Sequence, residues 1–262
     1  IITTSIPTKI REIIFLGTGT SSCTPLIGCL VAEKPKCRVC LSAAQGPSSK
    51  NCRLNISSIV RFEASDGTLK SILIDCGKTF YAAALQWAVP RRLGAFEAVL
   101  LTHGHADAML GLDDLRHWTG HGALQDRVDI WADKATMEVV QRTFPYLVDS
   151  GKATGGGFVS DLAFYNITPE EPFHIGGLDI LPIKVEHGII SEGIPYYCLG
   201  FLMDQGRFAY FSDVSRFPEA ALQKLKEVQQ IELLVLDWPL SWSSCYQMPR
   251  FQELLLISST LR

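Results

Sequence analysis

The chain has 262 residues, which is enough to bury the core of one α/β domain. Apolar residues make up 47% and charged residues 19% of it, and this composition excludes an intrinsically disordered chain. The formal net charge of −3 provides no broad basic surface, so the composition carries no signal for a nucleic-acid partner.

The apolar runs and the cysteines bear on membrane contact and on the cellular compartment. No run is long enough to cross a bilayer and no signal peptide is visible, so we expect no membrane contact and a cytoplasmic protein. An organelle stays open, because the chain begins with Ile rather than Met and looks truncated there. Eight unevenly spaced cysteines favour metal binding or free thiols over a disulfide framework. Because no repeat or linker is visible, we expect a single domain over residues 1–262.

The first predicted strand covers residues 9–16 and ends in a glycine-rich turn at residues 17–22. This turn lacks the Gly-x-Gly-x-x-Gly spacing that opens a helix, so we expect no dinucleotide site.

Three cysteines follow in a Cys-rich insert at about residues 28–52. Cys37 and Cys40 form a Cys-x-x-Cys pair, and Cys29 precedes them. A turn of this kind can bring two thiolates onto one zinc ion, and three cysteines leave a tetrahedral structural site one ligand short. The alternative is three free thiols in a loop.

A hairpin is predicted next, with strands at residues 56–62 and 71–74 joined by an Asp-Gly turn. The second strand ends in Asp75. An Asp at the end of a buried strand often orients a metal ligand through a hydrogen bond, and the alternative is a plain cap of the strand end.

The strongest chemical signal follows a predicted helix at residues 80–89 and an apolar strand at residues 96–101. His103 and His105 lie two residues apart in an extended segment, so their side chains share a face. Asp107 comes just after them, on the turn into a helix predicted to start near Met109. Two imidazoles and a carboxylate at the end of one strand suit zinc or a similar divalent ion.

The same pattern of an apolar strand followed by a metal-capable residue recurs later in the chain. A short strand at residues 128–132 and a helix at residues 134–144 come first. We then expect a second sheet from strands at residues 162–167, 173–175, 178–185, 196–203 and 207–211. His187 follows the third of these strands and Asp213 follows the fifth. A helix at residues 218–228 and a strand at residues 231–236 complete the predicted elements.

The motif Thr-His-x-His-x-Asp-x-x-x-Gly-Leu after an apolar strand resembles the first motif of the metallo-β-lactamase fold hydrolases. The Gly-Cys insert with its Cys-x-x-Cys pair is similar to that of the PhnP-type phosphodiesterases within this family. The resemblance implies an α/β fold, a four-layer αββα sandwich of two mixed β-sheets flanked by helices, here incomplete at the C-terminus.

The resemblance also implies roles for the polar residues. In the family pattern, three histidines bind a first metal, one Asp binds a second metal and another Asp bridges both. On this chain the implied residues are His103, His105 and His187 for the first ion, Asp107 for the second, and Asp213 as the bridge. Asp75 would support the site, and Cys29, Cys37 and Cys40 would hold a structural zinc together with a His that the sequence does not identify.

The chain departs from the family pattern at three points. Most of the family has a histidine where this chain has Ala108, and that histidine binds the second metal. Cys245 occupies the place of a histidine that donates a proton to the leaving group. The last strand, with a further metal histidine, is absent. The remaining ligands for a second ion are carboxylates, so manganese is an alternative to zinc there.

These observations favour a metal-dependent hydrolase with one or two zinc ions, in which Asp107 and Asp213 act at the reaction centre. The expected substrate is a small or cyclic phosphodiester, and a homodimer is compatible with the sequence. The alternative is a catalytically weak or inactive truncated homologue that binds metal without turnover. Thioester or lactam hydrolysis is a third candidate, because a fold does not set the substrate.

Overall fold

The computed structural model describes residues 9–120, 124–228 and 231–236. The chain divides into two compact units, one spanning residues 10–166 and the other beginning at residue 167. Each unit is built around one mixed β-sheet, which confirms the predicted α/β class. The prediction of a single domain over residues 1–262 stays a prediction. Among the helices that the structure describes, none is long and apolar enough to cross a membrane.

The sheet of the first unit has six strands in the order β1-β2-β3-β4-β5-β6. Strands β2 and β3 pair antiparallel, whereas β3 with β4 and β4 with β5 pair parallel. The strands are β1 (Lys9–Gly17), β2 (Ser57–Glu63), β3 (Leu69–Ile74), β4 (Ala98–Leu100), β5 (Val128–Asp133) and β6 (Leu162–Ile167).

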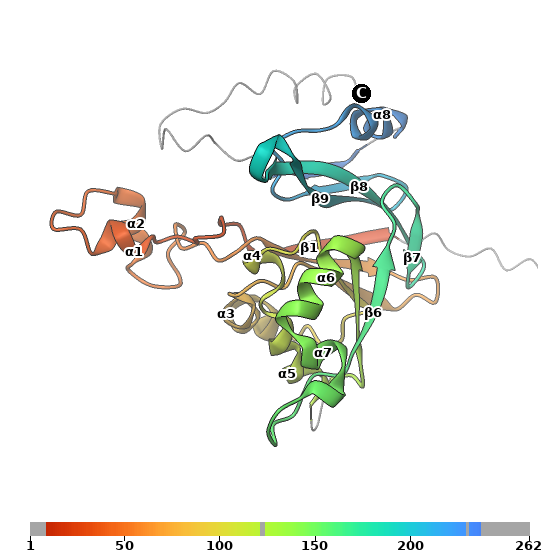
Figure 1. Ribbon diagram of the computed structural model, residues 1–262, viewed down its shortest axis with the longest axis horizontal. Coiled ribbons are helices and arrows are strands. Elements are labelled where there is room, and N and C mark those ends of the chain that lie inside the picture. Colours follow the sequence, from red (N-terminus) through yellow and green to blue (C-terminus); the bar gives the residue numbers. More distant parts are fainter. Residues whose placement is uncertain (1–8, 121–123, 229–230, 237–262) are drawn as a thin grey trace, which may run out of the picture. The chain divides into compact units, whose positions relative to one another are not determined.

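Short helices connect these strands. The α-helices are α1 (Ile27–Leu30), α2 (Arg38–Ala43), α3 (Phe80–Ala83), α4 (Ala106–Met109), α5 (Arg116–Thr119), α6 (Lys134–Thr143) and α7 (Pro145–Val148). Helix α3 continues as a π-helix (Ala84–Ala88) and a 3₁₀ turn (Val89–Arg91), and further 3₁₀ turns lie at Leu112–Leu115 and Ser150–Lys152. Helices α1 and α2 lie in an arm that extends away from the sheet (Figure 1).

Local chemistry explains two of the predicted connections. In the β2–β3 hairpin, Asp66 accepts hydrogen bonds from the backbone and hydroxyl of Thr68, and Gly67 adopts φ +79°, which favours glycine. Helix α6 begins at Asp133, whose carboxylate accepts the backbone N–H of Thr136 at 2.9 Å, as a good N-cap does.

The position of β6 corrects a prediction. Residues 162–167 were expected in the second sheet, but β6 lies next to β5 at the edge of the first sheet. Trp131 of β5 and Tyr165 of β6 stack with ring centroids 4.7 Å apart. Alternation within one strand cannot specify which neighbour it pairs with, so this aromatic contact was not visible in the sequence.

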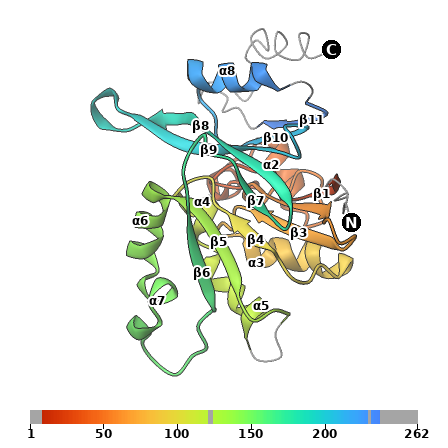
Figure 2. The same cartoon turned by 90° about the vertical axis from the view of Figure 1, so that its right-hand side faces the viewer.

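The sheet of the second unit has five strands in the order β11-β10-β9-β8-β7. Its strands are β7 (Phe173–Ile175), β8 (Leu178–Ile189), β9 (Pro195–Met203), β10 (Phe208–Phe211) and β11 (Leu233–Leu236). Strands β8 and β9 form a long hairpin that ends in a 3₁₀ turn at Ser191–Gly193 (Figure 2). Helix α8 (Glu219–Glu227) packs its buried Ala221 and Leu225 into the core of this unit, against side chains such as Val185 and Phe211.

Two element boundaries also differ from those expected. Helix α4 begins at Ala106 rather than near Met109, so Asp107 lies in its first turn. Strand β8 continues past Val185 to Ile189, so His187 lies inside a strand rather than after its end. A register irregularity between Glu186 and Gly188 marks a β-bulge at this point, and bulges of this kind re-aim a side chain.

We predict that Gly200→Ala destabilises the second unit by about 1–3 kcal/mol through overpacking. A Cβ at Gly200 would lie 2.0 Å from a ring carbon of the fully buried Phe211. Gly188→Ala is the matched control in the same sheet, because a Cβ there meets no atom within 4 Å. Urea unfolding should show a lower midpoint for the first variant only, and equal midpoints would contradict the packing argument.

Candidate metal centre

Thr102, His103 and His105 extend the chain beyond the central strand β4. All three residues of β4 are fully buried, and Leu101 continues the pairing by donating its N–H to the carbonyl of Trp131 at 2.9 Å. His103 is buried and His105 is exposed, with their ring centroids 4.7 Å apart in a T-shaped arrangement. The structure therefore brings the two predicted imidazoles together at the end of the strand.

Asp107 is buried in the first turn of α4, two residues after His105. Backbone hydrogen bonds dock α4 onto the segment that follows β3: Cys76 N–H to Ala108 O at 2.7 Å, and Lys78 N–H to Ala106 O at 3.2 Å. Between them, a Cβ at Gly77 would lie 1.7 Å from the carbonyl oxygen of Asp107. Glycine is required there, because any side chain would push α4 and its carboxylate away.

Asp75 is fully buried and hydrogen-bonds to Thr102, the residue before His103. Its carboxylate accepts the backbone N–H of Thr102 at 2.8 Å and contacts the Thr102 hydroxyl, which in turn lies 2.9 Å from His103 Nδ1. Its backbone has φ +60°, a conformation that is strained for Asp, and its carbonyl accepts the Ser57 hydroxyl at 2.8 Å. Strain of this kind is typical of functional positions.

His187 and Asp213 belong to the second unit. The His187 ring lies 5.7 Å from the ring of Tyr196 across the β8–β9 pair. Asp213 follows β10 with φ +49°, and its carbonyl accepts the Cys198 thiol at 3.5 Å. Each side chain is partly buried. Their participation with His103 in one metal site stays a prediction.

The glycine-rich turn after β1 is held by Asn55, whose amide donates to the carbonyls of Thr20 and Ser21 at 3.0 and 3.3 Å. Cys23 ends this turn with φ +60°. Burial raises the pKa of the Cys23 thiol, the Lys78 ammonium opposes the rise, and the Asp107 carboxylate adds to it. Cys23, at the end of the turn, thus lies within electrostatic range of Asp107.

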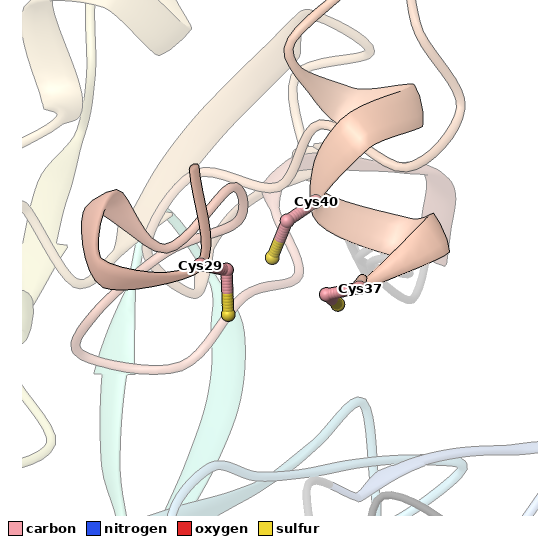
Figure 3. Close-up of side chains that lie close together, drawn as sticks. All are labelled: Cys29, Cys37 and Cys40. Carbon is pink, nitrogen blue, oxygen red and sulfur yellow. The ribbon is translucent and has the colours of Figure 1, made fainter. Parts of the chain in front are cut away.

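The three insert cysteines form a second cluster (Figure 3). Cys29 comes from α1, Cys37 is the residue before α2, and Cys40 lies within α2. The three Sγ atoms all lie within 4.8 Å of one another. The structure therefore brings together the three thiols that the sequence predicted as zinc ligands. This favours a zinc site over three separate free thiols.

Two thiols of this cluster differ in how readily they ionise. The hydrogen bond with Cys40 and the burial of the thiol raise the pKa of Cys29 to about 11, whereas hydrogen bonds from Cys40 lower that of Cys37. Cys37 is therefore the thiol that ionises before Cys29. A bound zinc ion would deprotonate every thiol that coordinates it.

Both donor sets fit divalent metals. Imidazole and carboxylate donors at the end of β4 suit zinc, and the three thiols suit a structural zinc site. Ala108 is buried and offers no ligand atom. Cys245 lies outside the residues that the structure describes.

Sequence reasoning missed three residues near the centre. Thr102 contacts both Asp75 and His103, the Lys78 backbone N–H donates to the carbonyl of Ala106 in α4, and Cys23 lies within electrostatic range of Asp107. Thr102 could have been noted from its place between strand and histidine. Lys78 and Cys23 carried no signal, because only the tertiary fold brings their segments to α4.

Residues 70–248 match the family described as the β-lactamase superfamily domain. A curated relative, an octanoyltransferase of Porphyromonas gingivalis, is 28% identical over 213 residues, which are 81% of this chain and 37% of the relative. The chain thus spans little more than a third of that protein's length.

Two solved structures are similar over most of the chain. A diphosphatase from the PhnP family is 26% identical with a TM-score of 0.63, over 86% of this chain and 73% of the other. Zn²⁺-bound PqqB from Methylobacterium extorquens is 19% identical with a TM-score of 0.61, over 84% and 71%. These similarities confirm the predicted fold.

Gly77→Ala should displace α4 without altering any proposed ligand. We expect a loss of about 1–3 kcal/mol in unfolding free energy from overpacking and weaker metal binding at the histidines. Gly94→Ala is the control, because a Cβ there meets no atom within 4 Å. Calorimetric zinc titration and urea unfolding of both variants check this, and equal affinities for zinc would refute it.

Cys37→Ala should lower the melting temperature by several degrees and remove one zinc per chain, because a metal that binds only the folded state stabilises it. Cys52→Ala, a partly buried free cysteine outside the cluster, is the control. Elemental analysis alongside thermal unfolding gives both values. Unchanged zinc content in Cys37→Ala would show that the cluster holds no metal.

Proposed function

We propose that this chain, which belongs to the β-lactamase superfamily, is a metal-dependent hydrolase of small phosphodiesters. The observation that carries the proposal is the arrangement after β4: buried His103, adjacent His105 and Asp107 in the first turn of α4, with Asp75 beneath them. The similarity to a diphosphatase of the PhnP family supports a phosphorus–oxygen bond as the target.

The proposed ligands of the first ion are His103, His105 and His187, and zinc is the ion that three imidazoles suit best. The last of these histidines is assigned by its resemblance to a family motif. Asp107 and Asp213 are the proposed ligands of a second ion. Manganese is the alternative there, because carboxylates favour harder ions.

When bound, a divalent ion supplies a water that ionises near neutral pH, and it neutralises charge on a phosphoryl oxygen. The chain's own residues perform the remaining tasks. Asp107 and Asp213 hold negative charge at the reaction centre, where they can orient a water and accept its proton. Asp75 and Thr102 keep the imidazole of His103 oriented.

Positive charge near the centre suits an anionic substrate. Lys78 is exposed and follows Gly77, and its backbone N–H donates to the carbonyl of Ala106 in α4. Arg53 is exposed and donates to the Thr18 hydroxyl at 3.0 Å in the glycine-rich turn. Both side chains can attract a phosphate, although the net charge of −3 favours a small molecule over a nucleic acid.

A second candidate is a homologue that binds metal without turnover. Ala108 favours it, because this buried position in α4 provides no ligand for a second ion. The name of the octanoyltransferase describes a protein much longer than this chain, and acyl transfer is not part of the proposal.

We expect the wild-type chain to bind metal at the histidines and to hydrolyse bis-p-nitrophenyl phosphate. His103→Ala should lose one metal ion per chain and all turnover, because two remaining imidazoles hold zinc poorly. His117→Ala is the matched control, since this exposed histidine lies against Tyr81 rather than in the site.

Elemental analysis and the release of p-nitrophenol measure these outcomes. Equal metal content in His103→Ala and His117→Ala would refute the ligand assignment. Metal at the histidines of the wild type without turnover would instead favour the inactive homologue.

A further inference from the structure

Three buried side chains form a continuous hydrogen-bonded chain in the first unit. Asp75, Thr102 and His103 are each at most 1% exposed. The Thr102 hydroxyl oxygen lies 3.0 and 2.9 Å from the two carboxylate oxygens of Asp75, and 2.9 Å from His103 Nδ1. The backbone N–H of Thr102 donates to Asp75 Oδ1 at 2.8 Å, which fixes the carboxylate in place.

The number of protons decides the direction of these hydrogen bonds. A hydroxyl has one proton to donate, and a carboxylate can only accept. The Thr102 proton therefore goes to Asp75, and the Thr102 oxygen is left as an acceptor. Because Nδ1 of His103 lies at hydrogen-bond distance from that oxygen, Nδ1 must be the donor.

We propose that Thr102 is a positioning residue that holds His103 in its Nδ1–H tautomer. The lone pair of the imidazole then lies on Nε2, the nitrogen left for a metal ion. The Asp75 carboxylate accepts the proton of the Thr102 hydroxyl, and the hydroxyl oxygen then serves as the acceptor for Nδ1–H of His103. The tautomer itself is a property of the metal-free chain, and only its consequence for metal binding rests on the proposed function.

Asp75→Asn provides the sharpest test, because the amide has the shape of the carboxylate but can donate. Its oxygen can still accept the Thr102 N–H, and its NH₂ can occupy the Oδ2 position and donate to the Thr102 hydroxyl. The hydroxyl proton then turns to His103 Nδ1, and the imidazole switches to the Nε2–H tautomer. The variant should retain the fold and lose the ligand nitrogen.

Nitrogen NMR of the full chain, dialysed against a chelator, reads the tautomer directly. Each of the six histidines is assigned by its single replacement, at a pH above the ordinary imidazole pKa of about 6.5. We expect Nδ1–H for His103 in the wild type and Nε2–H in Asp75→Asn. Nε2–H in the wild type, or Nδ1–H in both proteins, would overturn the proposal.

Two substitutions of Thr102 keep the test decisive if Asp75→Asn does not fold. Thr102→Ser retains the hydroxyl and should retain the Nδ1–H tautomer. Thr102→Val has nearly the same shape without the hydroxyl, so His103 should no longer be held in the Nδ1–H tautomer. If Thr102→Val keeps His103 as Nδ1–H, the hydroxyl does not select the tautomer and the proposal is wrong.

Zinc titration of the same proteins separates this inference from the proposed function. We expect Asp75→Asn and Thr102→Val to bind zinc at the histidines about 10–100-fold more weakly than wild type, with Thr102→Ser close to wild type. If the tautomers are as predicted but neither the wild type nor any variant binds zinc at His103, the role of Thr102 stands and the proposed metal site is refuted. Equal zinc affinities together with the predicted tautomers would refute the consequence for metal binding.

Discussion

The candidate centre depends on one close contact, the docking of the segment after β3 against the segment after β4. Gly77 leaves room for the carbonyl of Asp107, and backbone hydrogen bonds from Cys76 and Lys78 close the contact. This places the fully buried Asp75 under Thr102. A buried carboxylate is costly unless its oxygens are hydrogen-bonded, and Thr102, which donates to both oxygens of Asp75, also contacts the proposed metal ligand His103.

The Cys-rich arm meets a different constraint. Helices α1 and α2 are only four and six residues long, and α1 buries no side chain. Several apolar side chains of the arm are exposed, among them Ile27 at 78% and Val31 at 76%. A segment with so little core needs a cross-link to hold a fixed shape, and three converging thiols are suited to a zinc ion. Stability in the arm and chemistry in the centre are thus assigned to different residues.

The departure from the family pattern at Ala108 concerns the proposed second ion rather than the first. His103 and His105 are in place with their supporting carboxylate, whereas Ala108 is a buried side chain without a ligand atom. If the proposed centre holds a single zinc ion, it can still activate water, because one zinc suffices for that in other enzymes. Whether the chain is a working hydrolase or an inactive homologue therefore depends on what the carboxylates of Asp107 and Asp213 do in the proposed centre.

The sequence by itself determined the features that arise from neighbours along the chain. These are the buried strand before His103, the Asp66-Gly67 hairpin, the helix that starts at Lys134 and the spacing of Cys37 and Cys40. Local hydrogen bonds and the alternation of strand side chains specify such features, so a pattern of residues is enough to predict them.

The tertiary structure alone decided which distant segments meet. It placed β6 beside β5 rather than in the second sheet, extended β8 past His187, and brought Asp75 against Thr102, the neighbour of His103. Strand neighbours and hydrogen-bond partners far apart in sequence are selected by packing of the whole core. A residue such as Thr102 acquires its role only when that packing is complete, because its two partners come from the ends of two different strands.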